Sequence, residues 1–158
     1  ALATRPDRTV VDPFFGASAV GVLDAIGGGL EGVVAIAHAT SARQAIHRIA
    51  ASVSAIDGAA DARAAQALIE SSFDLIVEVG RGRSGKQRVV RHFELASEGN
   101  ERKLRELFEF VVDASQPERG DGAFQPTGLV PVLVTEQRAL GVRIDDSGFR
   151  RGAAVRVP

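Results

Sequence analysis

Short apolar runs alternate with stretches of helical spacing along the first half of the chain. β-Branched and aliphatic residues run together at Thr9–Asp12 and at Val33–Ala37, and each run predicts a strand. The second run is apolar throughout, which is typical of a strand buried on both faces. Apolar residues that recur every three or four positions predict helices. These helical stretches are Ala19–Ile26, the segment that follows Ser41, and Asp61–Ser71.

Two serines are the expected N-caps of the first two helices, because a serine hydroxyl accepts a hydrogen bond from a free amide of the first turn. Ser18 precedes the first helical stretch. Ser41 precedes a stripe of apolar positions that should face a core. The stripe consists of Ala45, Ile46, Ile49 and Val53.

The second half of the chain is richer in strands. Phe73–Val79 predicts a strand, and Gln87–Leu95 is its expected hairpin partner. The later elements are a strand at Leu107–Val112, a short helix at Thr135–Leu140 and a loose end over residues 149–158. Alternating strands and helices followed by hairpins predict an α/β fold with a C-terminal portion rich in β-hairpins.

Composition and charge restrict the classes of function. The chain has 158 residues, of which 45% are hydrophobic and 25% charged, the mix of a globular protein. Its net charge of −1 gives no general attraction to nucleic acid or to anionic membranes. The absence of cysteine excludes disulfides and thiolate metal sites. The only aromatic residues among phenylalanine, tyrosine and tryptophan are eight phenylalanines, which gives little support to base stacking.

The chain begins with Ala1 and contains no methionine. A strand follows almost at once, and a strand needs sheet neighbours. We therefore expect a piece of a longer protein that begins inside a domain, with processing after initiation as the alternative. No apolar run approaches the ~20 residues of a membrane helix, and no signal peptide is visible.

Five motifs follow one another along the chain. The first two are R-P-D-R with its strand and glycine, at Arg5–Gly16, and H-A-T-S with the next helix, at His38–Ile49. The others are D-L-I-V, a basic hairpin with its second strand, and a closing F-x-x-T-G-L-x-P at Phe124–Pro131. In this order and spacing they resemble the type II/type IV secretion ATPases. Within that family the chain is most similar to the CpaF/TadA branch, the motor of the tight-adherence pilus system.

The resemblance implies a fold, partners and a location. The fold would be part of a P-loop NTPase (RecA-like) sheet with flanking helices and a C-terminal portion rich in β-hairpins. Residues 1–112 would be the C-terminal part of the ATPase domain and residues 113–158 a C-terminal extension, partly loop. The full-length protein would form a hexameric ring in the cytoplasm, held at the inner membrane by secretion or pilus platform proteins. ATP and Mg²⁺ are the family's cofactors; neither nucleic acid nor membrane insertion is implied.

One stretch matches most of a phosphate-binding loop. Gly80–Gln87 has the glycines and the lysine of the G-x-x-x-x-G-K-[ST] pattern. Gln87 stands where a metal-binding hydroxyl is required. The residues after it predict a strand rather than a helix, so no helix N-terminus would face the phosphates. We interpret the stretch as a basic hairpin turn, and we expect any true phosphate-binding loop upstream of Ala1.

Three polar positions of the family site hold other residues here. By resemblance the Walker B glutamate falls on Pro13, an arginine on Phe15 and a histidine on Leu30. Proline can neither hold a metal through water nor accept a proton. Asp12 is adjacent and could replace the acid, but strand alternation should aim its side chain away from the nucleotide unless Pro13 distorts the strand end. The resemblance therefore implies impaired catalysis.

His38 is the candidate catalytic residue. It follows the carboxyl end of a strand, from which an imidazole would reach a γ-phosphate; the alternative is a partly buried histidine bonded to a backbone carbonyl. In motors of this class, arginines at subunit borders neutralise phosphate charge, whereas the alternative for them is a solvated surface. The candidates for nucleotide binding are Arg5, Arg8, Asp12, Arg43 and Arg48. No spacing of His, Asp or Glu predicts a metal site.

Three functions stay open on the sequence. The first is the C-terminal portion of a pilus-assembly or protein-secretion ATPase motor, which couples ATP hydrolysis to the transport of pilin or another substrate and is catalytically impaired in this chain. The second is a non-catalytic (pseudo-ATPase) subunit with a structural or regulatory role in the same ring. The third is an unrelated α/β binding module.

Overall fold

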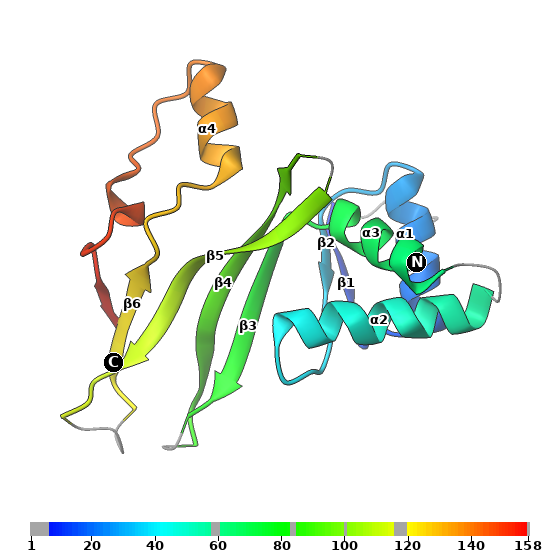
Figure 1. Ribbon diagram of the computed structural model, residues 1–158, viewed down its shortest axis with the longest axis horizontal. Helices are drawn as coiled ribbons and strands as arrows, with labels where there is room; N and C mark the ends of the chain where they lie inside the picture. The colour runs from blue at the N-terminus through cyan, green and yellow to red at the C-terminus, as the bar shows by residue number, and fades with distance from the viewer. Residues whose placement is uncertain (1–6, 58–60, 83–84, 100, 116–119, 158) are drawn as a thin grey trace. The chain divides into compact units, whose positions relative to one another are not determined.

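The computed structural model describes residues 7–57, 61–82, 85–99, 101–115 and 120–157 (Figure 1). The chain divides into two compact units. The first contains the described residues up to Asp74 together with the segment Gly99–Arg102. The second contains Leu75–Glu98 and the described residues from Lys103 onward.

A parallel pair of strands belongs to the first unit. β1 (Thr9–Val11) pairs in parallel with β2 (Val33–Ala35). Beyond the strands, the amide of Ile36 donates to the carbonyl of Val11 (2.9 Å), and the amide of Phe14 donates to the carbonyl of Ile36 (2.7 Å). Backbone pairing therefore continues past both strands, and it brings their carboxyl ends to one place.

Three helices complete the first unit, namely α1 (Ala17–Gly27), α2 (Ala42–Asp57) and α3 (Ala62–Ser72). Phe14 is buried and packs edge-to-face on Phe73, with ring centroids 5.4 Å apart. The helices contribute most of the remaining core because their apolar stripes are buried. These core residues include Ala19, Leu23, Ile46, Ile49, Val53 and Ile69.

One face of the parallel pair is exposed. Val10 and Val34 lie opposite each other in the pairing, so they point to the same face. Their exposed fractions are 66% and 53%, and Ile36 is exposed as well. The prediction that Val33–Ala37 is buried on both faces is therefore wrong. A run of apolar residues does not by itself distinguish a strand buried on both faces from a strand with one exposed face.

The two expected N-caps differ in outcome. Ser41 is confirmed, because its hydroxyl accepts the amide of Gln44 at 3.2 Å. Ser18 is wrong as an N-cap, because α1 begins at Ala17 and its N-cap is Gly16. Gly16 has a φ of 58°, a conformation that favours glycine. The Ser18 hydroxyl bonds back to the loop that precedes the helix.

The second unit is built on a five-stranded sheet with the strand order β3-β4-β5-β6-β7. The pairings of β3 with β4, of β5 with β6 and of β6 with β7 are antiparallel. The strands are β3 (Leu75–Arg81), β4 (Gln87–Glu98), β5 (Glu101–Val112), β6 (Gly122–Pro126) and β7 (Val155–Val157). The predicted hairpin of β3 and β4 is confirmed. The loose end predicted for residues 149–158 is wrong, because β7 pairs with β6.

A buried carboxylate anchors the first residue of α4 (Val132–Ala139) through a hydrogen bond. Glu94 of β4 is buried, and its Oε1 accepts the amide of Val132 at 2.6 Å. Its Oε2 lies 3.7 Å from Nη1 of Arg105 on β5. A helix N-terminus presents free amides and a partial positive charge, so a carboxylate placed there is stabilising. This anchor explains why the helix begins before the predicted start at Thr135.

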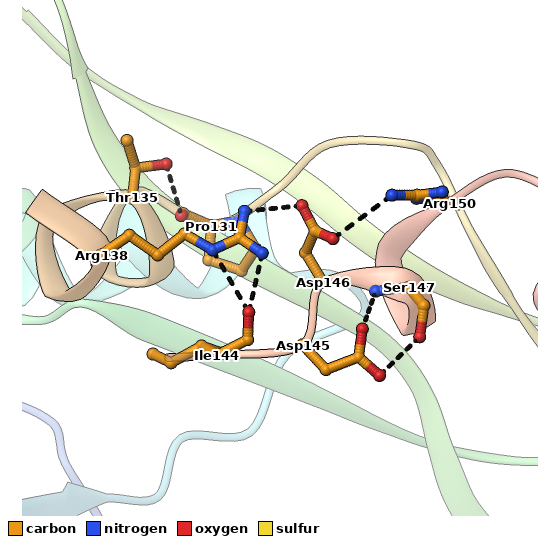
Figure 2. Close-up of polar contacts among 8 residues, drawn as sticks. All are labelled: Pro131, Thr135, Arg138, Ile144, Asp145, Asp146, Ser147 and Arg150. Carbon is orange, nitrogen blue, oxygen red and sulfur yellow. Dashed lines mark hydrogen bonds and ion pairs between the residues drawn. The ribbon is translucent and has the colours of Figure 1, made fainter. Parts of the chain in front are cut away.

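Figure 2 shows how the segment after α4 is fixed. Arg138 donates to the carbonyl of Ile144 (3.2 and 2.7 Å) and to the carboxylate of Asp146 (2.7 Å). Asp145 accepts the amide and the hydroxyl of Ser147, which belongs to the short 3₁₀ helix η2 (Ser147–Phe149). The bond from Arg138 lowers the pKa of Asp146, and the bonds from Ser147 lower the pKa of Asp145. Both carboxylates are thus engaged in holding the loop.

The described residues form a mixed α/β chain, with helices around a parallel strand pair and a separate antiparallel sheet. The predicted α/β class and the hairpin-rich second half are confirmed, while the P-loop NTPase fold stays a prediction. Residue 112, where the sequence predicts a boundary, ends β5, which pairs with β6. No helix among the described residues is both long and apolar enough to cross a membrane.

Candidate functional site at the ends of the parallel strands

A cavity of about 200 Å³ lies where β1 and β2 end. The carboxyl ends of parallel strands are the usual place for ligands in α/β sheets. The cavity is smaller than the ~300–1,000 Å³ of pockets for drug-sized ligands, so it suits a single ring or side chain. Its walls come from the residues after β1, from the loop after β2 and from α2. They are Pro13, Phe14, Phe15, Ala37, His38, Ala45, Arg48 and Ile49.

A wider depression of about 640 Å³ lies beside Arg138 and the segment Gly141–Asp145. It is largely open to solvent, and the charged groups of Arg138 and Asp145 are engaged with Asp146 and Ser147. Because Arg138 and Asp145 are engaged within the chain and the depression is wide open, we place the candidate site in the smaller cavity.

His38 and Asp12 face each other beside the cavity. His38 Nε2 lies 4.0 Å from Asp12 Oδ1, and the two side chains are 84% and 56% exposed. The two groups form an ion pair only when the imidazole is protonated. The sequence predicts that Asp12 points away from the nucleotide unless Pro13 distorts the strand end; in the structure the regular strand ends at Val11, the backbone bends at Asp12 and Pro13, and the Asp12 side chain lies beside His38. The alternative of a buried structural histidine does not describe so exposed a side chain.

Arg48 of α2 links the two loops at the cavity. Its Nη1 donates to the carbonyl of His38 at 2.8 Å, and its guanidinium lies 5.9 Å from the centroid of the Phe15 ring. Ser52, one turn further along α2, accepts the amide of Gly16 at 3.0 Å. The helix therefore positions the loop after β1 and the loop after β2 together. The sequence predicted Arg48 as a phosphate ligand, but its contacts to His38 and Phe15 were not foreseen, nor was the role of Ser52.

The wall of the cavity on the β1 side is apolar. Pro13 occupies the position that the resemblance gives to an acid, Phe14 is 2% exposed and fills the floor, and Phe15 is 48% exposed. The only cation and the only imidazole among the lining residues are Arg48 and His38. No lining residue carries a carboxylate to orient water; Asp12, outside the lining, lies 4.0 Å from the imidazole.

The other predicted nucleotide ligands do not join this group. Arg8 precedes β1 and donates to the carbonyl of Asp7 (2.7 Å), so it lies at the amino end of the strand. Arg43 is exposed on the first turn of α2 and does not line the cavity. Arg5 lies outside the described residues. Among the predicted site residues that the structure describes, only His38, Asp12 and Arg48 lie together.

The described residues supply neither a cluster of metal ligands nor a phosphate-binding loop. Within the described part of the chain, no group of three His, Cys, Asp or Glu side chains is arranged for a metal ion. The stretch Gly80–Gln87 joins two antiparallel strands, and the amide of Gly82 donates to the carbonyl of Lys86 (3.1 Å). It is a hairpin turn, as predicted, although its residues 83 and 84 lie outside the described part. A phosphate-binding loop needs a helix after it, and here a strand follows.

A second polar cluster, in the sheet of the second unit, was not predicted. Arg91 on β4 lies 3.7 Å from Glu78, 3.4 Å from Glu106 and 3.1 Å from Glu109, which come from the strands on either side. Burial, more than any other cause, raises the pKa of Glu106, and the charge of Arg91 opposes that rise. The hydrogen bond to Glu109 raises the pKa of Arg91. The cluster links three strands. Its members are brought together by the strand register, which their spacing in the sequence does not reveal.

The chain matches no protein-family model and no curated protein when it is compared with them. The secretion-ATPase resemblance therefore depends on the sequence motifs alone.

Proposed function

We propose that this chain is the C-terminal portion of a pilus-assembly or protein-secretion motor of the CpaF/TadA type whose ability to hydrolyse ATP is impaired. One observation carries the proposal. His38 and Asp12 meet at the carboxyl ends of a parallel strand pair, and the neighbouring Pro13 is the residue to which the resemblance assigns the catalytic acid.

The strand pairing supports the proposal because it joins the two most specific motifs. The segment Arg5–Gly16 contains β1, and the segment His38–Ile49 begins shortly after β2. Residues 12–32 separate the two strands in the chain, yet the parallel pairing brings the residues that follow β1 beside His38.

The open face of the strand pair also supports a larger assembly. Val10, Val34 and Ile36 expose aliphatic surface on one side of β1 and β2. Parallel strands in α/β proteins are normally covered on both faces. In a motor ring, further strands and neighbouring subunits would supply that cover, which agrees with a homo-oligomeric, hexameric assembly held at the inner membrane by platform proteins.

The second candidate function is a non-catalytic, pseudo-ATPase subunit of the same ring. The apolar cavity wall favours it, because Pro13 and Phe15 replace groups that would handle water and phosphate charge. Such a subunit would pack in the ring and transmit motion without turnover of its own. Both candidates agree that these residues do not supply a water-activating acid at the family position.

The test is ATP hydrolysis by the full-length gene product that contains these residues. We expect turnover by the unmodified protein to be negligible and the Pro13→Glu variant to hydrolyse ATP faster by about 100-fold, the effect of a positioned general base. Pro13→Gln is the matched control, because it removes the proline without adding an acid. Rapid turnover by the unmodified protein would refute impaired catalysis.

Nucleotide binding separates the two candidates. Binding of ATP by the unmodified protein, measured by calorimetry, is expected for an impaired motor. If neither the unmodified protein nor Pro13→Glu binds ATP, the motor is refuted and the pseudo-ATPase subunit is the remaining candidate. Light scattering then tests the pseudo-ATPase candidate, because a ring subunit must form an oligomer with the mass of the ring.

A further inference from the structure

Positive charge is concentrated in the hairpin of β3 and β4. From Val79 to Phe93 the sequence has five lysine or arginine residues and no aspartate or glutamate. The other residues include 14 of the 19 basic side chains and all 20 acidic ones, so their formal net charge is −6. The net charge of −1 for the whole chain therefore conceals a strongly basic segment.

Two cations flank the turn of this hairpin. Arg81 and Lys86 are exposed, and Arg81 donates to the carbonyl of Gly85 at 3.0 Å, which holds its guanidinium beside the turn. The turn itself is closed by backbone bonds from Gly82 and Gly85. In the described part of the chain, neither Arg81 nor Lys86 pairs with a carboxylate. Their charge is therefore available to an external anion.

Exposed aliphatic side chains lead up to these cations. Leu75, Val77 and Val79 alternate along β3, so they share one face of the strand, and all three are exposed. β3 is the last strand on its side of the sheet. Apolar side chains next to cations are the combination with which peripheral proteins bind a lipid interface, because the two kinds of group meet acyl chains and headgroups respectively.

We propose that the β3–β4 hairpin binds the surface of membranes that contain anionic phospholipid. Arg81 and Lys86 contact headgroup phosphates, and Val79 lies at the boundary with the acyl chains. The contact is direct, so it goes beyond the proposed function, in which protein partners hold the motor at the membrane, and it does not rest on the nucleotide site.

Nucleic acid fits this surface less well. No phenylalanine, tyrosine or tryptophan occurs between Asp74 and His92, so the hairpin offers no ring for base stacking.

The experiment is vesicle flotation with the purified chain. The probes are vesicles of phosphatidylcholine alone and of phosphatidylcholine mixed with phosphatidylglycerol, each at low and at high salt. We expect binding to the mixed vesicles only, and weaker binding in high salt. The double variant Arg81→Gln with Lys86→Gln should bind about 30-fold more weakly, since each cation near an anionic surface contributes about 1 kcal/mol.

The matched control is Arg63→Gln with Arg143→Gln, which removes the same charge from exposed positions outside the hairpin. This control should bind like the unmodified chain, and circular dichroism should show that both variants are folded. An equal loss of binding in the control would overturn the proposal, because binding would then depend on the net charge of the chain and not on the hairpin. So would binding to single-stranded DNA or to polyglutamate without binding to the phosphatidylglycerol vesicles.

Discussion

The cavity of the first unit and the surroundings of α4 in the second unit use their charged side chains differently. Beside the cavity of the first unit, His38 and Asp12 are 4.0 Å apart and exposed. In the second unit, Asp146 bonds Arg138 at 2.7 Å and Glu94 bonds the first amide of α4 at 2.6 Å. Charges that satisfy one another at hydrogen-bond distance fix a loop or a helix. Charges that stand loosely beside a cavity stay available to a ligand, so we assign the functional site to the first unit.

The largest expected effect comes from removing the floor of the cavity. Phe14 is buried and packs on Phe73, so Phe14→Ala leaves a void in the core of the first unit. We expect the free energy of unfolding to fall by about 3 kcal/mol, as measured by urea denaturation.

Phe15→Ala is the matched comparison, because Phe15 is adjacent and half exposed. Phe15→Ala should lower the free energy of unfolding by roughly 1 kcal/mol or less. Equal losses for Phe14→Ala and Phe15→Ala would contradict the description of one ring as core and the other as cavity wall.

The next effect concerns the anchor of α4. Glu94→Ala removes a buried carboxylate from the amide of Val132 and from Arg105. We expect a loss of about 2 kcal/mol of unfolding free energy and faster hydrogen exchange in α4. Glu94→Gln keeps an acceptor for the amide of Val132 and should lose less unfolding free energy than Glu94→Ala. Unchanged exchange in α4 of the alanine variant would show that Glu94 is not its anchor.

The smallest effect is a pH dependence in the Arg91 cluster. Burial raises the pKa of Glu106 above its ordinary value of 4.5, so the folded chain holds this proton more tightly than the unfolded chain. The contribution of Glu106 to stability is therefore most favourable below pH 4.5 and declines as pH rises through the raised pKa. Glu106→Gln should remove that decline, which urea denaturation at a series of pH values would reveal. Parallel pH profiles for the two proteins would refute this role of Glu106.

Local patterns in the sequence predicted much of the fold but little of its long-range contacts. The helical stripe after Ser41 and the hairpin partner at Gln87–Leu95 were correct, because spacing and turn residues act over a few positions. The exposed face of Val10 and Val34 was missed, since apolar character does not reveal what covers a strand.

The candidate site shows the same limit. The place of His38 at a strand end followed from the order of elements, and the approach of Asp12 did not, because it depends on where β1 stops. The bond from Arg48 to His38 joins residues on a loop and a helix, and the Arg91 cluster joins three strands. Such contacts are set by register and packing, which a single sequence does not specify.

We propose that the site at the ends of β1 and β2 retains the histidine of the family and lacks its water-activating acid. The decisive measurement is steady-state ATP hydrolysis by the unmodified full-length protein, compared with that of its His38→Ala variant. We expect phosphate release no faster than in the absence of protein, with no difference between the two proteins. Sustained turnover that His38→Ala abolishes would contradict it, because an intact catalytic site would then exist without an acid at Pro13.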